Sequence, residues 1–384
     1  MHKNNVGTTY RDMLKFRYNT HITFIAEYLA PKIRRHETII IGTHPETFHA
    51  DEVMAVAILT TLLDKFGATY EVRRLSRHNQ EQLEEATVLL DVGRTFDPST
   101  GRFDHHQPGG AGRRITHLNR QDVPLSTCGL IWYACGLMLT GEHSDVQAND
   151  DTQTTLAFDK IDREVVRGID ASDNGLGMPN GFTINEADGS ISEMPGSPLH
   201  FSKMIGQFNS SNIYDTEAQT RQFNQALALA KMVFQNALQD AISYANTRPQ
   251  LLDALNRQVT GSPKVLQLDR YMRWSEHLPH LPEGNEVQMV ISPLSGPKGE
   301  WNVTIVKRRN RFRGNPAPRH WCGKENADLE AAAGIPGLLF CHDHGHMLRT
   351  ASLEAALAVA DVLLGKSPIG APRQTAQAQA LLHA

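Results

Sequence analysis

Short apolar runs alternate with amphipathic stretches in the first part of the chain. The runs at 37–42, 68–75 and 87–91 are rich in aliphatic residues, which favours strands. Between them, 50–66 repeats apolar side chains at helical spacing, and 79–86 predicts a shorter helix. This alternation of strands and helices predicts a parallel sheet covered by helices, so we expect a fold of the α/β class.

Longer elements and irregular segments follow. A stretch over 176–199, rich in Gly, Pro, Asn and Ser, predicts a long loop. Alternating apolar and polar residues predict strands within 287–291 and 301–306. The Ala- and Gln-rich tail over 370–384 is expected to fray. Further helices are expected over 11–35, 126–139, 152–169 and 216–246.

Side chains that can bind metal ions follow the apolar runs. In an open α/β sheet, the carboxyl ends of the strands form the ligand crevice. Each group alone would be more ordinary as a surface residue or a helix cap, but their shared position at strand ends favours a metal site. In chain order they are His44, His49, Asp51, Asp91 and the triplet Asp104-His105-His106.

The predicted helix over 152–169 runs into two more carboxylates, Asp170 and Asp173. Spaced three residues apart, they share one face of a helical turn. Carboxylates at the C-terminal end of a helix oppose its macrodipole, and a bound cation would resolve this conflict. We favour Asp173 as a ligand and Asp170 as its support. Imidazole and carboxylate without thiolate suit octahedral Mn²⁺, with Mg²⁺, Co²⁺ or Fe²⁺ as alternatives.

Composition limits the class of protein. The net charge of −4 gives no general attraction to nucleic acid, so any phosphate recognition is expected to be local. The four cysteines form no CxxC pair, which argues against a zinc ribbon or a disulfide scaffold and fits a reducing cytoplasm. We expect no membrane span and no signal peptide.

The order of these motifs is similar to that of the DHH phosphoesterase superfamily, and more closely resembles the MYG1 family of metal-dependent hydrolases. The resemblance covers about residues 38 to 360. Two positions depart from the family pattern: Glu46 replaces a Gly, and the segment over 340–350 is shorter and richer in His. The segments that carry the resemblance are 42–52, 90–93, 104–107, 128–131, 173–175, 274–278 and 334–337.

The resemblance implies a parallel-sheet, DHH-type phosphoesterase domain followed by a smaller α/β substrate-binding domain, with the active site in the cleft between them. It divides the chain into an N-terminal extension (1–36), a metal-binding catalytic domain (37–200), a long connecting helix (201–250), a substrate-binding domain (251–366) and a flexible tail (367–384).

The resemblance also implies roles for the metal-binding side chains. His44, His49 and Asp91 would hold one ion. Asp51, Asp91, His105 and Asp173 would hold a second, so Asp91 would bridge the two. His106 would donate to a phosphate oxygen or assist the leaving group, and Asp104 would orient its neighbours.

Substrate contacts are expected from a basic run with one aromatic residue over 307–313, which could track a nucleic-acid backbone and stack a base. A solvated strand edge would show the same pattern. The His residues at alternate positions after residue 341 share one face if they form a strand, and suit phosphate contact, a spare metal site or a plain polar edge. The candidates are Arg113, Arg114, Arg309, Arg311, Phe312, Arg313, His342, His344, His346 and Arg349.

The implied activity is a 3′→5′ exonuclease acting on RNA or a short oligonucleotide, with two Mn²⁺ ions activating water. Two alternatives stay open: a small-molecule phosphatase or pyrophosphatase with the same metal centre, and a non-catalytic homologue that binds metal or RNA. The extra carboxylate of Glu46 could tune the metal or narrow the substrate mouth. The sequence does not indicate an oligomeric state.

Overall fold

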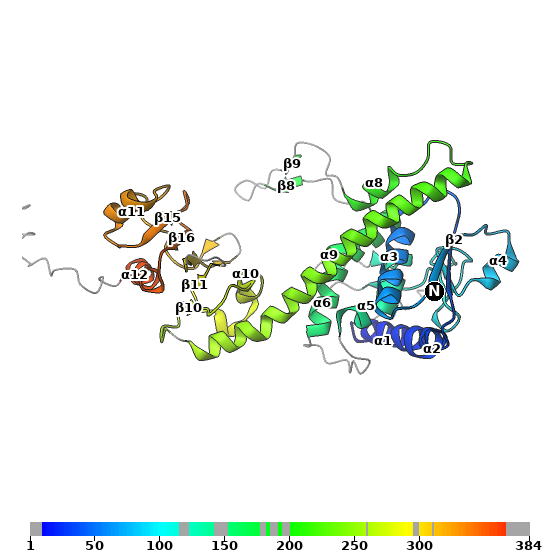
Figure 1. Cartoon of the computed structure of the whole chain (residues 1–384), viewed down its shortest axis with the longest axis horizontal. Coiled ribbons are helices and arrows are strands. Elements are labelled where there is room, and N and C mark those ends of the chain that lie inside the picture. Colours follow the sequence, from blue (N-terminus) through cyan, green and yellow to red (C-terminus); the bar gives the residue numbers. More distant parts are fainter. Residues whose placement is uncertain are drawn as a thin grey trace, which may run out of the picture. The chain divides into compact units, whose positions relative to one another are not determined.

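The chain forms two compact units, Met1–Ala245 and Asn246–Ala384, whose boundary lies inside a long helix, α9 (Thr216–Arg257) (Figure 1). The computed structural model describes residues 10–114, 123–141, 153–176, 182–184, 191–193, 200–258, 260–294, 299–308 and 311–365.

The first unit is built on a five-stranded sheet. Its strand order is β2 (Tyr70–Arg74), β1 (Ile39–Thr43), β3 (Val88–Leu90), β5 (Arg102–Phe103) and β4 (Phe96–Asp97). Every neighbouring pair is parallel except β4 and β5 at the edge. The prediction of an α/β fold with a parallel sheet is therefore confirmed.

Alternate residues of these strands enter different cores, as the two-residue period of a strand requires. Ile39 and Ile41 join the main core with helices α3 (Ala50–Lys65) and α5 (Thr127–Thr140). Ile40 faces a smaller cluster beneath α4 (Gln80–Glu85). Nearly every side chain of α3 and α5 is buried, because the two helices pack on each other as well as on their surroundings.

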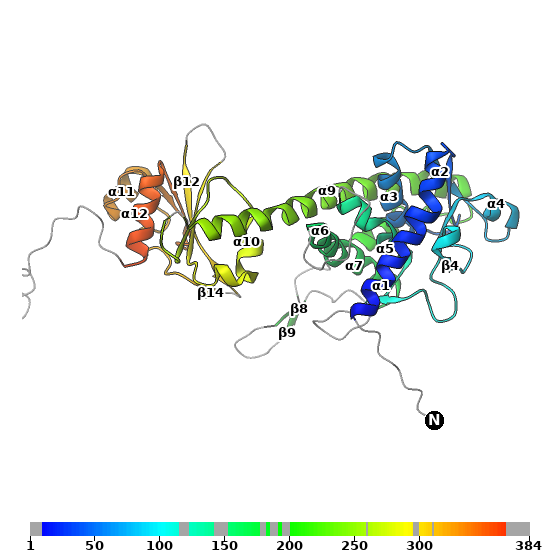
Figure 2. The same cartoon turned by 90° about the horizontal axis from the view of Figure 1, so that it is seen from below.

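Other helices surround this core. The predicted N-terminal helix is one helical run, made of α1 (Tyr10–His21), a π-helical stretch η1 (Ile22–Leu29) and α2 (Ala30–Arg34). The helix predicted to end at residue 169 continues to Asp173 as α6 (Gln153–Ile161), a π-helical stretch η3 (Asp162–Val166) and α7 (Arg167–Asp173). A short helix, α8 (Phe201–Gly206), precedes α9 (Figure 1). The helix α1 packs against α5 (Figure 2).

The second unit contains a mixed sheet in the order β10 (Val265–Gln267), β11 (Met289–Pro293), β12 (Trp301–Ile305), β16 (Met347–Thr350) and β15 (Leu338–Cys341). Only β10 and β11 pair in parallel. One core contains residues of α11 (Asn326–Ala333) and α12 (Leu353–Leu363). A separate core joins the end of α9 to residues beside α10 (Trp274–His277).

One predicted helix end and one predicted loop differ from the structure. The helix expected to end at residue 246 continues to Arg257 despite Pro249, because Leu251, Ala254 and Leu255 pack into the core of the second unit. The segment expected to be a long loop contains a pair of antiparallel strands, β8 (Phe182–Ile184) and β9 (Ile191–Glu193). Its other residues between 177 and 199, and the predicted tail, lie outside the described ranges.

Within those ranges, no helix combines the length and apolar character needed to cross a membrane.

Candidate metal centre

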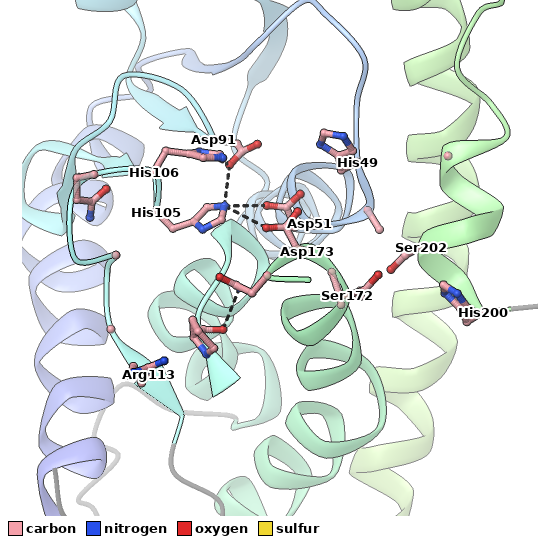
Figure 3. Close-up of a pocket in the computed structure, with 18 of the residues that line it drawn as sticks. His49, Asp51, Asp91, His105, His106, Arg113, Ser172, Asp173, His200 and Ser202 are labelled. Carbon is pink, nitrogen blue, oxygen red and sulfur yellow. Dashed lines mark hydrogen bonds and ion pairs between the residues drawn. The ribbon is translucent and has the colours of Figure 1, made fainter. Parts of the chain in front are cut away.

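The predicted metal-binding side chains meet at the carboxyl edge of the parallel sheet (Figure 3). His44 follows β1, Asp91 follows β3 and His105 follows β5. His49 and Asp51 stand at the start of α3, and Asp173 ends α7. Parallel strands deliver their following residues to one edge of a sheet, so residues distant in sequence converge here.

His105 faces three carboxylates. Its Nε2 atom lies 3.2 Å from Asp173 Oδ2, 3.4 Å from Asp91 Oδ1 and 3.8 Å from Asp51 Oδ2. Burial alone would lower the pKa of His105, but the bonds to Asp173 and Asp91 outweigh it and raise that pKa to about 10. The imidazole is therefore charged at neutral pH in the absence of a cation.

A second group surrounds His44. Its Nε2 atom lies 3.0 Å from Glu52 Oε1 and 3.4 Å from Asp91 Oδ2. Burial again opposes the charged form, yet the bonds to Asp91 and Glu52 raise the pKa of His44 to about 10. Because Asp91 presents one carboxylate oxygen to His44 and the other to His105, it stands between two groups of donors.

His49 links these groups. Its ring lies 6.4 Å from that of His44, centre to centre. Side-chain donors of His44, His49 and Glu52 lie within 4.8 Å of one another, as do those of His49, Asp51 and Asp173. The arrangement provides two neighbouring clusters of nitrogen and oxygen donors.

The chemistry of these donors fits divalent cations. Asp51 is fully buried, and neither of its carboxylate oxygens accepts a hydrogen bond from a described residue. Burial, reinforced by the charges of Asp91, Asp173 and Glu52, raises the pKa of Asp51 well above its usual range. A buried carboxylate that accepts no hydrogen bonds is costly unless a nearby positive charge, such as a metal ion, compensates it. A cation in the centre would satisfy Asp51 and replace the protons on the two imidazoles.

The backbone conformation and the hydrogen bonds of Asp91 direct its carboxylate at the metal centre. Asp91 has a left-handed conformation with φ of 59°, which aspartate tolerates better than most residues. Its amide donates to the Phe103 carbonyl of the neighbouring strand, and its Oδ1 accepts a hydrogen bond of 2.9 Å from Thr127 Oγ1. The turn after β3 is therefore held on both sides while the carboxylate faces the centre.

Asp104 and His106 form a separate pair beside the centre. The fully enclosed Asp104 accepts hydrogen bonds from the His106 amide at 2.9 Å, from His106 Nδ1 at 2.8 Å and from the Arg94 amide at 2.7 Å. The His106 side chain is half exposed and has its Nδ1 fixed by this contact. Asp104 thus orients His106 and leaves Nε2 as the ring nitrogen that can contact a substrate.

Asp170 connects α7 to the start of α5 and to Arg114 through hydrogen bonds. One of its oxygens accepts hydrogen bonds from the Ser126 and Gly129 amides at the start of α5. The other accepts one from Arg114 Nη1, while the same guanidinium makes two bonds to Asp162. The predicted contact of Arg114 with a substrate phosphate is therefore wrong: this side chain is buried and fully engaged with two carboxylates.

A cavity of about 900 Å³ opens onto the centre. Arg113, unlike its neighbour, is exposed and lines this cavity, as does His200 from the region of α8 (Figure 3). Lys203 of α8 lines it too. These groups place positive charge and hydrogen-bond donors in front of the carboxylate cluster.

The family model for MYG1 exonucleases, described as an uncharacterised protein family (UPF0160), matches residues 40–364. This chain belongs to the MYG1 family. It is 28% identical to a MYG1 protein of Dictyostelium discoideum over 340 residues, which cover 86% of this chain and 98% of that protein. It is also 28% identical to the human MYG1 exonuclease over 373 residues, covering 91% of this chain and 93% of the human one. A solved exonuclease RecJ bound to manganese aligns with 94% of this chain and 96% of its own, at 13% identity and a TM-score of 0.27.

Two features of this MYG1-family site were missed by sequence reasoning. Glu52 is fully buried, accepts a 2.8 Å hydrogen bond from the His49 amide and directs its other oxygen at His44. Its place three residues after a helix-capping position is the signal that could have identified it. Lys203 had no such signal, because only the fold brings α8 to the cavity.

Glu46 lies at the edge of the centre. Its Oε2 atom is 3.4 Å from His44 Nδ1 and 3.4 Å from Arg77 Nη2. The Glu46 carboxylate therefore contacts the far side of a candidate metal ligand.

The residues of the second unit that were predicted to contact substrate differ in exposure and in their bonding partners. Arg309 and the side chain of Arg311 lie outside the described part of the chain. Phe312 is 38% exposed. Arg313 donates to the backbone carbonyls of Asn285 and Val287, so its predicted contact with substrate gives way to a role in holding the chain around it. Arg349 is partly exposed on β16, with Nε 3.6 Å from Glu300.

We expected His342, His344 and His346 to share one face of a strand, but they do not. They lie in the turn between β15 and β16, because Asp343 and Gly345 interrupt the strand pattern. The His342 and His346 rings are nevertheless 4.2 Å apart, and the His344 ring lies 5.5 Å from that of His342.

Proposed function

We propose that this chain is a metal-dependent phosphodiesterase that removes nucleotides from RNA in the 3′→5′ direction. The observation that carries the proposal is the buried carboxylate of Asp51, which accepts no hydrogen bond from a described residue and lies inside a cluster of imidazoles and carboxylates. The name of the human relative, MYG1 exonuclease, supports the same class of reaction.

His44, His49 and Asp91 would hold one cation, and Asp51, His105 and Asp173, with the bridging Asp91, a second. Glu52 would hold His44 in position or share the first ion. When bound, the cations supply positive charge that polarises a phosphoryl group and lowers the pKa of water.

The chain's own residues would bind and orient the phosphodiester. Arg113 and Lys203 line the cavity and would contact non-bridging oxygens through charge-assisted hydrogen bonds. His106, with Nδ1 held by Asp104, would when protonated on both ring nitrogens donate a hydrogen bond from Nε2 to the phosphate or a proton to the leaving oxygen. Because the Asp104 contact restricts the His106 ring to one orientation, it favours donation from Nε2 to a bound substrate.

RNA as the polymer is supported by the hairpin of β13 (Lys307–Arg308) and β14 (Arg311–Phe312), which has a basic sequence and carries the exposed Phe312 ring near Lys307. Single-strand binding proteins combine positive charge with aromatic stacking in this way. The cavity in front of the metal centre is also open enough to admit a chain end rather than only a small anion.

The test is to offer purified protein single-stranded RNA, DNA of the same sequence and pyrophosphate, with Mn²⁺ or with EDTA. RNAs blocked at the 3′ or at the 5′ end report the direction of digestion. We expect cleavage of RNA that EDTA and a 3′ block abolish and that the Asp91→Ala variant lacks. Hydrolysis of pyrophosphate alone would replace the proposal with a small-molecule phosphatase, and cleavage that persists in EDTA would remove the metal from it.

A further inference from the structure

A second cavity, of about 1020 Å³, lies entirely within the second unit. Its floor is formed by β11 and β12, one wall by the segment leading into α10, and the other by the β13–β14 hairpin and the turn before β16. We call it the Trp274 pocket. Its size is that of pockets that enclose small organic ligands.

The walls of the Trp274 pocket carry aromatic rings that the fold leaves open. Tyr271 is 60% exposed and Phe312 is 38% exposed, while Trp274 also contacts the adjoining core. The rings of Phe312 and His346 are nearly parallel, with 17° between their planes and 5.9 Å between their centres. Exposed apolar surface gathered in one concave place marks a binding site more often than chance exposure does.

The floor of the pocket is polar where the rest of that sheet face is apolar. Asn302 pairs with Ser292, and Thr304 pairs with Val290 of the adjoining core, so Asn302 and Thr304 continue the core-facing side of the sheet with an amide and a hydroxyl. The Asn302 side chain makes no hydrogen bond to any residue in the described ranges, and it lines the cavity. A free amide can donate to and accept from the edge of a heterocycle.

The charge in the pocket is small. Arg273 is engaged by Glu276 at 2.7 Å, and Lys307, 6.0 Å from the Phe312 ring centre, is a cation near the aromatic wall. Burial, together with the charges of His342, His344 and Lys307, lowers the pKa of His346, so this ring is neutral at pH 7 and suited to stacking. The Lys307 ammonium can contact a phosphate of a nucleotide bound in the pocket.

We infer that the Trp274 pocket binds the base of one nucleotide of a single-stranded nucleic acid, stacked against Tyr271 or Phe312 with its edge on Asn302. The inference deepens the proposed function, since it gives the second unit a base-binding role that is distinct from hydrolysis. Lys307 would contact the phosphate of the same nucleotide.

The test measures binding of a labelled five-nucleotide RNA and of an abasic oligomer with the same sugar–phosphate backbone, by fluorescence polarisation of the full chain in EDTA. Tyr271→Ala and Phe312→Ala should each weaken RNA binding about 5- to 150-fold and leave the abasic oligomer unchanged. Asn302→Leu should alter the preference among RNAs of different base. Tyr214→Ala, which removes an 87% exposed ring of the first unit, is the matched control and should change neither.

Equal affinity of wild-type protein for the two oligomers, or equal weakening of both by the pocket variants, would overturn the inference. Hydrolysis of a chromogenic phosphodiester with Mn²⁺, measured in parallel, separates this failure from that of the proposed function. Retained hydrolysis with no base effect rejects the pocket alone. Base-dependent binding without any hydrolysis supports the pocket and rejects the catalytic proposal.

Discussion

At the scale of single residues, the most informative position is Asp91. Sequence reasoning could find it because Asp91 follows an apolar strand, as His44 and the Asp104-His105-His106 triplet also do. Sequence reasoning could not find its φ of 59° or its contact with Thr127, since both depend on where β5 and α5 pack. The ligand types were thus predictable, and the geometry that points them at one place was not.

Replacing Asp91 with alanine should remove the carboxylate between the two donor groups. Two cations would then repel each other without a shared anion, so we expect metal content to fall and the rate on RNA to drop about 10²–10⁴-fold. Metal analysis after dialysis, together with single-turnover rates at saturating Mn²⁺, measures both effects. Asp269→Ala, at an exposed position in the second unit, is the control. Wild-type turnover in Asp91→Ala would contradict the assignment.

His21 gives a prediction about pH. Burial lowers the pKa of His21, despite its 2.7 Å bond from Nδ1 to the Ala134 carbonyl, and Arg17 lowers it further. The unfolded chain takes up this proton near pH 6.5, whereas the folded chain resists it to a lower pH. The contribution of His21 to stability is therefore present above pH 6.5 and is lost as the pH falls through that value.

Urea midpoints at pH 7.5 and 5.5 measure this loss. The variant His21→Asn keeps a donor near the Nδ1 position without a titrating ring. It should be less stable than the wild type at pH 7.5 but lose less stability on acidification. An identical loss in both proteins would show that other groups cause it.

At the scale of elements, the junction of α5 and α7 decides the position of Asp173. Asp170 caps the start of α5 and binds Arg114, and Asp173 follows less than one turn later. The sequence indicated the helix and its acidic end but misassigned Arg114, because exposed and buried arginines look alike in a sequence. Likewise, alternate His residues predicted a strand, and only the neighbouring Asp343 and Gly345 distinguish it from the observed turn.

Replacing Arg114 with methionine should therefore act on stability rather than on substrate affinity. Removing one partner leaves the buried carboxylate of Asp170 uncompensated, which typically costs about 3–5 kcal/mol. Urea denaturation measures this cost. Arg113→Met, its exposed neighbour in the cavity, should leave stability unchanged and raise the KM for RNA. Equal stability of the two variants would show that the buried network contributes little.

At the scale of the whole molecule, the metal centre belongs to one compact unit and the Trp274 pocket to the other. The α/β class followed from the order of strands and helices, since local periodicity records that order. The length of α9 could not be predicted in this way. A proline such as Pro249 usually ends a helix, and here the turns that follow it are stabilised by packing against residues distant in sequence.

If the first unit hydrolyses the phosphodiester and the second binds the RNA strand, changes in the second unit should alter the salt dependence of RNA binding. Neutralising Lys307, Arg308 and Arg311 with glutamine should weaken RNA binding and flatten its salt dependence, by about 0.7 in the log–log slope for each phosphate that the variant no longer binds. Hydrolysis of a small chromogenic phosphodiester should stay unchanged. Lys264→Gln with Lys324→Gln, at exposed positions of the same unit, is the matched control. Equal damage to both substrates would assign the hairpin to folding.

The continuity of α9 also affects how the protein is synthesised. Its last turns carry Leu251, Ala254 and Leu255, which become buried only against strands that lie later in the chain, including β11. At ordinary translation rates, the fifty or so residues that follow take roughly 2–10 s to be made. During that interval the first unit can be complete while the end of the helix still exposes its leucines. A nascent chain stalled there would present a ready target for chaperones and proteases.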